Sequence, residues 1–454
     1  MIPRTLDAIA AAVGGVRRGA DPEIRSVLTD SRAAADAALF VALRGERHDG
    51  HAFVGGAVGN GAVAVLVERE PDVDVPAVVV EDTGAALLAL GADERRRLSD
   101  TRVVGVTGAN GKTSTKDLTA GVLATRFRTH ASPASFNNEI GLPLTLLGAP
   151  VGTEVVVAEL GARHEGDVEE LCAVARPDIA VVTNIGVAHM EAFGSWDAIV
   201  RSGAEPVRAL PRGGSAVLNA DDPVVRTYAG QTEARVVRFG LAADADVRGE
   251  AVALEADGRA TFTLAVGDAR EAVALAVPGE HMVANALAAA AVGTVLGLSP
   301  AECAAALKDA RVSRWRMEPS VTASGVRILN DAYNANPESM AAGLRSARWI
   351  ARDVRLVAVL GHMAELGPIA FEEHERLGRL VVRIGVDRLV TVGEAARVIA
   401  RAAVREGALP EDVASYDDPA DAAADVRAHA GAGDVVFLKG SRVAGLERVA
   451  EALA

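Results

Sequence analysis

The stretch Val106–Ser114, VTGANGKTS, decides the fold class of this 454-residue chain. It follows the short β-branched run RVVGV at residues 102–106 and precedes TKDLTAGVLATRF at 115–127, whose length and apolar spacing predict a helix. A glycine-rich turn between a strand and a helix aims several backbone N–H groups at one point, where a polyphosphate can be held. The order strand, loop and helix therefore predicts an α/β nucleotide-binding domain.

The loop departs in one place from the usual phosphate-loop pattern, G-x-x-x-x-G-K-[ST], because Val106 stands at its first position. We expect Lys112 to reach the terminal phosphates and Thr113 or Ser114 to ligate a metal ion. A turn that only caps a helix is the alternative, but strand, loop and helix all lie where phosphate binding requires them. The residues expected at the nucleotide are Gly108, Asn110, Gly111, Lys112, Thr113 and Ser114.

Length, charge and cysteine content limit the class of protein. A chain of 454 residues exceeds what one hydrophobic core usually organises, so several domains are expected. The formal charge of −14 argues against nonspecific nucleic-acid binding. Only Cys172 and Cys303 occur, too few for a disulfide framework or a cysteine zinc site. With no secretory signal and no apolar stretch of about 18 residues, we expect a cytoplasmic protein, monomeric, with small-molecule partners and no membrane span.

The alternation of strands and helices predicts three α/β domains, at residues 1–100, 101–311 and 312–454. Apolar strands separated by helices imply mostly parallel sheets covered on both faces. The charged run DERRRLSDTR at residues 93–102 marks the first boundary. The segment 241–268 is irregular or antiparallel.

Three helices and several strands can be bounded from the pattern alone. Helices are expected at Leu6–Val13 and Thr83–Arg97, and residues 281–298 form a buried helix rather than a membrane span. The expected strands include ALFVAL and AVAVLVE in the first domain, EVVVAEL, DIAVVTNI and SAVLNA in the second, and VRILNDAY, VRLVAVLG, DRLVTVG and DVVFLKGS in the third.

Polar side chains follow two apolar strands of the second domain. Glu159 follows EVVVA, and His189 follows DIAVVTNIGVA. Near the phosphate loop, a carboxylate and an imidazole can hold Mg²⁺ directly or through water, although imidazole is an unusual ligand for this cation. Simple hydrogen bonding is the alternative for each residue taken alone.

Two clusters in the third domain also lie at strand ends. In NDAYNANPESM, Asn336 before Pro337 predicts a helix start, because asparagine caps orphan N–H groups and proline suits the first helical position. Capping leaves Asp331, Tyr333 and Asn334 crowded at the strand end. In VVFLKGSR, the cluster Lys439, Ser441 and Arg442 is either an anion site or a solvated turn.

Together these motifs resemble the Mur ligase family over nearly the whole chain. TDSR and LFVALRGERHDGHAF are similar to that family's uridine-nucleotide domain. The other motifs follow in the family's order: VGVTGANGKTSTK, FNNEIGLPLTLL, VAELGARHEGD, VTNIGVAHMEAFGS, LNADDP, NDAYNANPESM, VLGHMAELG and LKGSR.

The resemblance implies an N-terminal UDP-sugar domain, a central phosphate-loop ATPase domain and a C-terminal Rossmann-like domain. It also implies a ligase that uses ATP and Mg²⁺ to phosphorylate a carboxylate, after which an amine attacks the acyl phosphate. The members most similar to this chain join D-alanyl-D-alanine to UDP-N-acetylmuramoyl-tripeptide in peptidoglycan precursor synthesis. The alternatives are a ligase for another carboxylate and amine pair and a non-catalytic nucleotide-binding protein.

The resemblance also assigns expected roles to individual residues. Lys112 and Mg²⁺ stabilise charge on the γ-phosphate, Thr113 and Glu159 help hold magnesium, and His189 serves a second metal. The other expected contacts are Asn137 and Asn138 near the phosphates or the acceptor, Asn285, Arg316 and Asp331 at the nucleotide, Tyr333, Asn334 and Asn336 near the dipeptide, and Asp30, Ser31, Arg32, Asp49, Gly50 and His51 at the uridine nucleotide.

Three positions differ from the family pattern. The lysine that the family modifies to a carbamate aligns with Gly203, which cannot carry one. We expect Glu205, Glu165 or a small anion in the space beside the glycine to take its place. Met282 replaces an asparagine expected beside the adenine, and His362 replaces an aspartate in GHMAELG. These changes favour a remodelled metal site or another substrate pair.

Overall fold

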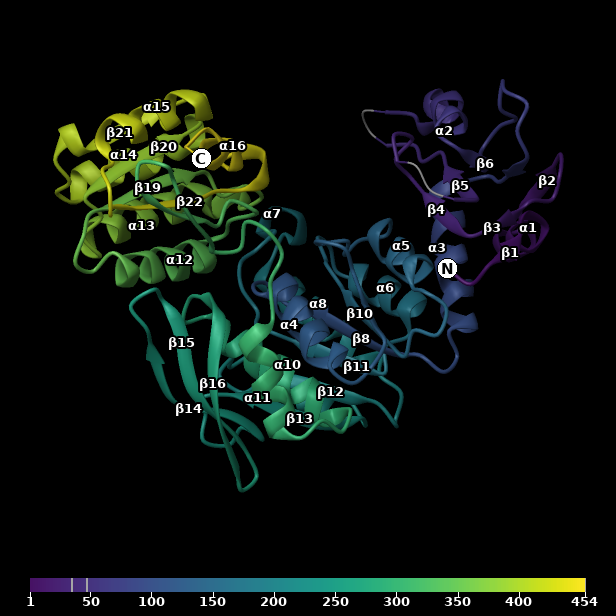
Figure 1. The fold of residues 1–454 in the computed structure, drawn as a ribbon, viewed down its shortest axis with the longest axis horizontal. Coiled ribbons are helices and arrows are strands. Elements are labelled where there is room, and N and C mark those ends of the chain that lie inside the picture. Colours follow the sequence, from purple (N-terminus) through teal and green to yellow (C-terminus); the bar gives the residue numbers. More distant parts are fainter. Residues whose placement is uncertain (34–35, 46–47, 454) are drawn as a thin grey trace.

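The computed structural model describes residues 1–33, 36–45 and 48–453. Positions 46 and 47, which belong to the RGERHDGH stretch, and residue 454 lie outside the described residues. The chain forms three α/β units around sheets of five, nine and six strands, with a further two-stranded pair, β1 and β3. Figure 1 shows the N-terminal and C-terminal units at opposite ends of the central unit. The predicted α/β fold class with three domains is confirmed.

The N-terminal unit has a sheet in the order β2-β7-β6-β5-β4, parallel except for β2. The helices expected at Leu6–Val13 and Thr83–Arg97 are confirmed with these bounds. The elements are β1 (Arg4–Thr5), α1 (Leu6–Val13), β2 (Val16–Arg18), β3 (Glu23–Ile24), β4 (Ser26–Leu28), β5 (Ala38–Val41), η1 (Gly50–Phe53), α2 (Val54–Gly59), β6 (Ala62–Val67), β7 (Ala77–Val79) and α3 (Thr83–Arg97).

The charged run at residues 93–102, expected to mark the first domain boundary, begins inside a helix. Helix α3 includes its first five residues and packs on α5 and α6 of the central unit. Within it, Arg95 donates from Nε to the carbonyl of Ala175 at 2.8 Å and lies 3.3 Å from the Asp178 carboxylate. Helix α3 therefore ties the N-terminal unit to the central one.

The central unit has a sheet in the order β16-β15-β14-β13-β12-β11-β8-β10-β9. From β9 to β14 the pairs are parallel, and β14, β15 and β16 form an antiparallel extension, which settles the ambiguous segment 241–268 as antiparallel. The elements are β8 (Arg102–Thr107), α4 (Lys112–Ala124), β9 (Thr129–Ala131), α5 (Gly141–Gly148), β10 (Val155–Glu159), α6 (Asp167–Ala175), β11 (Ile179–Val182), α7 (Met190–Phe193), α8 (Trp196–Gly203), α9 (Glu205–Arg208), β12 (Ser215–Asn219), η2 (Val225–Gln231), β13 (Arg235–Gly240), β14 (Val247–Leu254), β15 (Arg259–Val266), β16 (Ala269–Pro278), α10 (Met282–Val295) and α11 (Pro300–Asp309).

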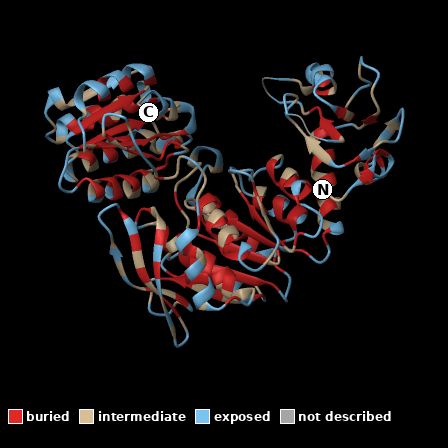
Figure 2. Ribbon diagram, viewed as in Figure 1, coloured by how far each residue is buried: buried red, intermediate tan, exposed pale blue. Residues whose placement is uncertain are grey.

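Helix α10 is buried over most of its surface, as its predominantly apolar sequence predicts. Its alanines at positions 286 and 288–291 have no exposed surface, and the helix packs against α4, which begins at the phosphate loop. Figure 2 shows both helices buried over the central strands. No helix in the described ranges is long and apolar enough to cross a membrane.

The C-terminal unit has a sheet in the order β17-β18-β22-β19-β20-β21, parallel except for β17. The four strands predicted here are confirmed as β18, β19, β20 and β22. The elements are β17 (Glu318–Val321), β18 (Arg327–Asn330), α12 (Pro337–Ile350), β19 (Leu356–Gly361), η3 (Gly367–Ile369), α13 (Ala370–Arg383), β20 (Arg388–Val392), η4 (Glu394–Ala396), α14 (Arg397–Glu406), η5 (Pro410–Asp412), β21 (Val413–Tyr416), α15 (Pro419–His429), β22 (Val435–Lys439), η6 (Arg442–Ala444) and α16 (Glu447–Leu453).

Candidate active site

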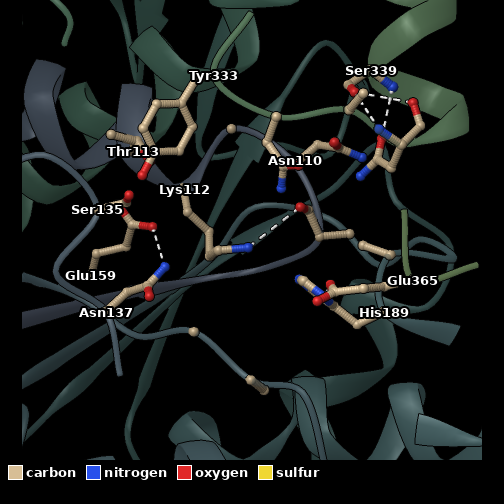
Figure 3. Close-up of a pocket in the computed structure, with 18 of the residues that line it drawn as sticks. Asn110, Lys112, Thr113, Ser135, Asn137, Glu159, His189, Tyr333, Ser339 and Glu365 are labelled. Carbon is tan, nitrogen blue, oxygen red and sulfur yellow. Dashed lines mark hydrogen bonds and ion pairs between the residues drawn. The ribbon is translucent and has the colours of Figure 1, made fainter. Parts of the chain in front are cut away.

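A cleft of about 960 Å³ lies where the central and C-terminal units meet. Its lining comes from the phosphate loop, from the carboxyl ends of β10 and β11, and from loops that follow β18, β19 and β22. The carboxyl ends of parallel strands are the usual ligand-binding edge of such sheets. Figure 3 shows side chains from both units converging on this space.

The phosphate loop joins β8 to α4 in a conformation that requires glycine. Gly111 precedes the helix with φ 79°, and a Cβ there would lie 2.4 Å from Oδ1 of Asn285. Lys112, the first residue of α4, folds back so that Nζ donates to the carbonyl oxygen of Gly108 at 2.6 Å. Burial lowers the pKa of Lys112, which the nearby Glu159 carboxylate partly opposes. The loop therefore holds a positive charge beside its backbone N–H groups.

Glu159 is the best candidate for a metal ligand. It ends β10 and is buried, and its Oε1 accepts a hydrogen bond from Nδ2 of Asn137 at 2.7 Å (Figure 3). Its Oε2 is buried without a hydrogen-bond partner among the described residues. A buried carboxylate oxygen is rarely left unpaired, and a hard cation would satisfy it.

The rest of the donor set also fits magnesium, which keeps several water or phosphate ligands. Thr113 places its hydroxyl near the loop, where Oγ1 accepts a hydrogen bond from Nη2 of Arg316 at 2.9 Å. Within the described part of the chain, no three His, Cys, Asp or Glu side chains are grouped so as to hold an ion. A bound ion would therefore depend on oxygens from the nucleotide and from water.

His189 lies opposite the loop and contacts the C-terminal unit. Its backbone has φ 58°, and its Nδ1 is paired with the carboxylate of Glu365 (Figure 3). Burial lowers the pKa of His189, the charge of Lys112 lowers it further, and Glu365 opposes both.

The cluster at the end of β22 is buried at Lys439 and Ser441 and exposed at Arg442. Lys439 is buried, and its Nζ lies 2.5 Å from Oδ2 of Asp331 and donates to the carbonyl of Asn334 at 3.1 Å. Burial lowers the pKa of Lys439, while Asp331 raises it. The capping prediction for Asn336 is confirmed, since its Oδ1 accepts from the backbone N–H of Ser339 at 2.9 Å.

The structure brings most of the residues predicted for the site into this one cleft. Gly108 is the exception within the loop, since it lines a small neighbouring cavity. The predicted residues that line the cleft are Asn110, Gly111, Lys112, Thr113, Ser114, Asn137, Asn138, Glu159, His189, Asn285, Arg316, Asp331, Tyr333, Asn334 and Asn336.

The residues predicted for the uridine nucleotide do not line the cleft and lie in the N-terminal unit: Asp30, Ser31, Arg32, Asp49, Gly50 and His51. Hydrogen bonds from Arg32 lower the pKa of Asp30 to about 2. His51 is held between Oδ1 of Asp49, at 2.6 Å from Nδ1, and the N–H of Glu68, which donates to Nε2 at 2.8 Å. Asn60 donates from Nδ2 to the carbonyl of Ser31 at 2.8 Å.

The Cβ position of Gly203 is occupied by neighbouring side chains, although Gly203 itself borders the small cavity that Gly108, Lys112 and His189 also line, and the expected small anion stays a prediction. A Cβ at Gly203 would lie 2.3 Å from Cδ1 of Ile185 and 2.7 Å from the hydroxyl of Tyr228. That hydroxyl is fixed, because it donates to the carbonyl of Val200 at 2.6 Å.

The two carboxylates expected to replace the family's lysine are also engaged elsewhere. Glu205 accepts hydrogen bonds from the N–H groups of Gly166 at 2.7 Å and Glu169 at 2.9 Å, at the start of α6. Glu165 forms a two-point ion pair with Arg201, at 2.6 and 2.8 Å. Both carboxylates therefore already have partners in this structure, and the expectation that one of them replaces the lysine stays a prediction.

Sequence reasoning missed several residues that line the cleft, among them His281 and Glu365. His281 has a buried Nδ1 with no hydrogen-bond partner in the described ranges, and Glu365 contacts His189. Both lie in segments noted for other positions, GEHMVAN and GHMAELG. The available signal was that His281 stands directly before α10 and Glu365 stands in the loop that follows β19.

Fold and site together define a three-domain phosphate-loop protein whose cleft is completed by a second α/β unit. Residues 106–293 match the Mur ligase middle domain, 315–442 the Mur ligase glutamate ligase domain, and 23–102 the Mur ligase family catalytic domain. The chain belongs to the Mur ligase family.

Individual relatives agree with this assignment. The UDP-N-acetylmuramoyl-tripeptide–D-alanyl-D-alanine ligase of Mycobacterium tuberculosis is 42% identical, over 100% of this chain and 98% of its own length. A crystal structure of MurF from Acinetobacter baumannii matches with a TM-score of 0.87 and 31% identity, covering 99% of this chain and 98% of that one. MurF ligase from Thermotoga maritima, in complex with ADP, matches with a TM-score of 0.81 and 29% identity, covering 94% of this chain and 97% of that one.

Proposed function

We propose that this Mur ligase joins D-alanyl-D-alanine to UDP-N-acetylmuramoyl-tripeptide with hydrolysis of ATP to ADP and phosphate. The observation that carries the proposal is the buried Oε2 of Glu159, which has no hydrogen-bond partner in the described part of the chain and lies near Lys112 in a cleft completed by the C-terminal unit. The similarity to ligases of this name over the whole chain supports the substrates.

The proposed reaction has two steps. An oxygen of the tripeptide carboxylate attacks the γ-phosphorus of ATP, the bond from that phosphorus to the β–γ bridging oxygen breaks, and ADP leaves. The free amine of the dipeptide then attacks the acyl carbon, the carbon–oxygen bond to phosphate breaks, and the amine nitrogen loses a proton. Both steps bring anions or a labile acyl phosphate into a site that must exclude water.

The chain's own residues would supply charge and position. Lys112 would leave the carbonyl of Gly108 and neutralise the γ-phosphate as charge moves onto it. Glu159 and Thr113 would hold Mg²⁺, which when bound screens the repulsion between carboxylate and triphosphate. Arg316 and Tyr333, stacked with 4.1 Å between guanidinium carbon and ring centre, would border the nucleotide.

The N-terminal unit would hold the uridine nucleotide through the residues around Asp30 and His51, and the C-terminal unit would present the dipeptide. Lys439 and Arg442 line that side of the cleft, where they pair with the carboxylates of Asp331 and Glu447. Arg442 stacks on Trp315, with 4.4 Å from its guanidinium carbon to the ring centre. We assign the carboxylate of the dipeptide to this side.

The test is phosphate release from ATP by the purified protein with both substrates, together with the mass of the product. Release that requires both substrates and yields the UDP-pentapeptide supports the proposal. ATP binding without product formation contradicts the proposal. It would favour another carboxylate and amine pair, because Gly203 stands where the family pattern has a lysine.

A further inference from the structure

The linker between the central and C-terminal units, residues 310–317, has an unusual backbone. Trp315 and Met317 have φ 61° and 53°, in the left-handed region that residues with side chains seldom adopt. Such conformations persist only where surrounding contacts fix them, and they occur often at functional sites. The contacts that fix this linker are therefore informative.

The first contact comes from the helix that carries the phosphate loop. Asp117, on α4, accepts two hydrogen bonds at its Oδ2, from the backbone N–H and from the hydroxyl of Ser313, both at 2.7 Å. The Oδ1 of Asp117 lies 2.6 Å from Nζ of the buried Lys116. Hydrogen bonds to a charged, partly buried acceptor are among the stronger ones in proteins.

The second contact returns to the same helix three residues further along the linker. Arg316 lies between the two left-handed residues and donates from Nη2 to the hydroxyl of Thr113 at 2.9 Å. Its guanidinium covers the ring of Tyr333, and its Nε is buried without a hydrogen-bond partner among the described residues. The linker thus touches α4 at Asp117 and again at Thr113, one turn apart on the helix.

Lys116, the neighbour of Asp117 on α4, connects this helix to a further segment beside the cleft. Its Nζ donates to the carbonyl oxygens of Ser132 at 2.7 Å and Ala134 at 2.9 Å, which precede Asn137. The adjacent pair Lys116 and Asp117 therefore connects the phosphate-loop helix to two segments that line the cleft.

We propose that Asp117 and Ser313 are positioning residues, which hold the start of the linker to α4 so that Arg316 lies against Thr113 at the nucleotide site. Neither residue lines the cleft. The inference rests on the proposed function only in taking the ligand of this site to be ATP or ADP.

The test compares Ser313→Ala with the rescue variant Ser313→Thr and with Ser299→Ala as a matched control. Ser299 caps α11 through its hydroxyl and Glu302, so its loss costs stability without touching the linker. In Ser313→Ala we expect the KM for ATP and the Kd for ADP, measured by calorimetry, to rise roughly tenfold, as for a lost hydrogen bond to a charged group. The KM for the UDP-peptide is expected to stay unchanged, and threonine is expected to restore the native values.

An ADP affinity of Ser313→Ala equal to that of Ser299→Ala would overturn the proposal, because the hydroxyl would then be merely structural. So would an equal rise in both KM values. ADP binding can be measured without the ligation reaction. A native protein that binds ADP but forms no product would therefore refute only the proposed pair of substrates. A native protein that binds no ADP refutes the nucleotide site and this inference together.

Discussion

Lys112 is the residue on which the chemistry depends most. Its Nζ donates only to carbonyl oxygens of its own loop, Gly108 and, at 3.4 Å, Ala109, among the contacts in the described ranges. Its loss should therefore leave the fold intact while removing positive charge from the γ-phosphate. We expect Lys112→Ala to lose at least about 100-fold in kcat, the usual cost of removing a preorganised charge-stabilising donor. Phosphate release measures this, and near-normal turnover with an unchanged melting temperature would refute the phosphate-loop assignment.

Gly203 allows a prediction about packing. Because Ile185 and Tyr228 already occupy the position of a Cβ, Gly203→Ala should destabilise the protein by about 1–3 kcal/mol, the usual cost of overpacking. Urea unfolding measures the loss. The second substitution Ile185→Val removes the nearer atom, Cδ1, and is expected to recover part of the stability. A Gly203→Ala variant as stable as the native protein would contradict the packing described.

For single residues, the sequence predicted those functional side chains whose positions are set by neighbouring residues in the chain. Lys112 and Asn336 belong to a loop and a cap that neighbouring residues define. The surroundings of Gly203 were not predictable, because Ile185 and Tyr228 come from distant parts of the chain. Glu365 likewise meets His189 only through the docking of one unit on another.

Among the elements, the loop after β19 and the short helix α7 form a contact between two units. Glu365 pairs with His189 through its side chain, and its carbonyl accepts from the N–H of Glu191 at 3.1 Å. We expect Glu365→Gln to lower kcat roughly tenfold, because the imidazole loses the charge that orients it. The control is Glu372→Gln, on the exposed start of α13.

The matching measurement is the affinity for Mn²⁺ in the presence of ADP, followed by electron paramagnetic resonance. We expect Glu365→Gln to weaken it and the control variant to leave it unchanged. Equal affinities in the two variants would show that Glu365 has no influence on the ion site.

The elements themselves were predictable where one periodicity dominates. Helix α1 and helix α3 have the expected bounds because caps at Thr5 and Asp82 agree with the apolar spacing. The antiparallel strands β14–β16 were harder to assign, because a register shift between Glu250 and Ala253 interrupts their alternation. The role of the charged end of α3 was not predictable from composition, because Arg95 bonds to the central unit while Arg96 pairs with Asp93 of the same helix.

For the whole molecule, the buried pair Arg388 and Asp425 ties β20 to α15. The carboxylate accepts from Arg388 at 2.8 and 2.6 Å and from the hydroxyl of Tyr416 at 2.8 Å. Burial raises the pKa of Asp425, but these hydrogen bonds outweigh it and the net pKa lies below the ordinary value. The pair therefore contributes stability above the unfolded pKa, near 3.9, that is lost as the pH falls through the folded one.

We accordingly expect the free energy of unfolding to fall below about pH 4. Asp425→Asn should cost about 3–5 kcal/mol at neutral pH, because Arg388 is left buried without its charge partner. It should also flatten the acid limb of the stability curve. Asp421→Asn, on the exposed face of the same helix, is the control. An unchanged acid limb in Asp425→Asn would contradict this account.

The alanine surface of α10 has a consequence for how the molecule moves. Alanine has no side-chain rotamers to rearrange, and the buried alanines of α10 pack in one core with Leu118 and Val122 of α4, so we expect the two helices to move together. The two helices should therefore behave as one rigid unit, with the phosphate loop and Asn285 at the same end. Their amide hydrogens are expected to exchange with deuterium only when the central unit unfolds globally, while the linker amides near Trp315 exchange through local opening.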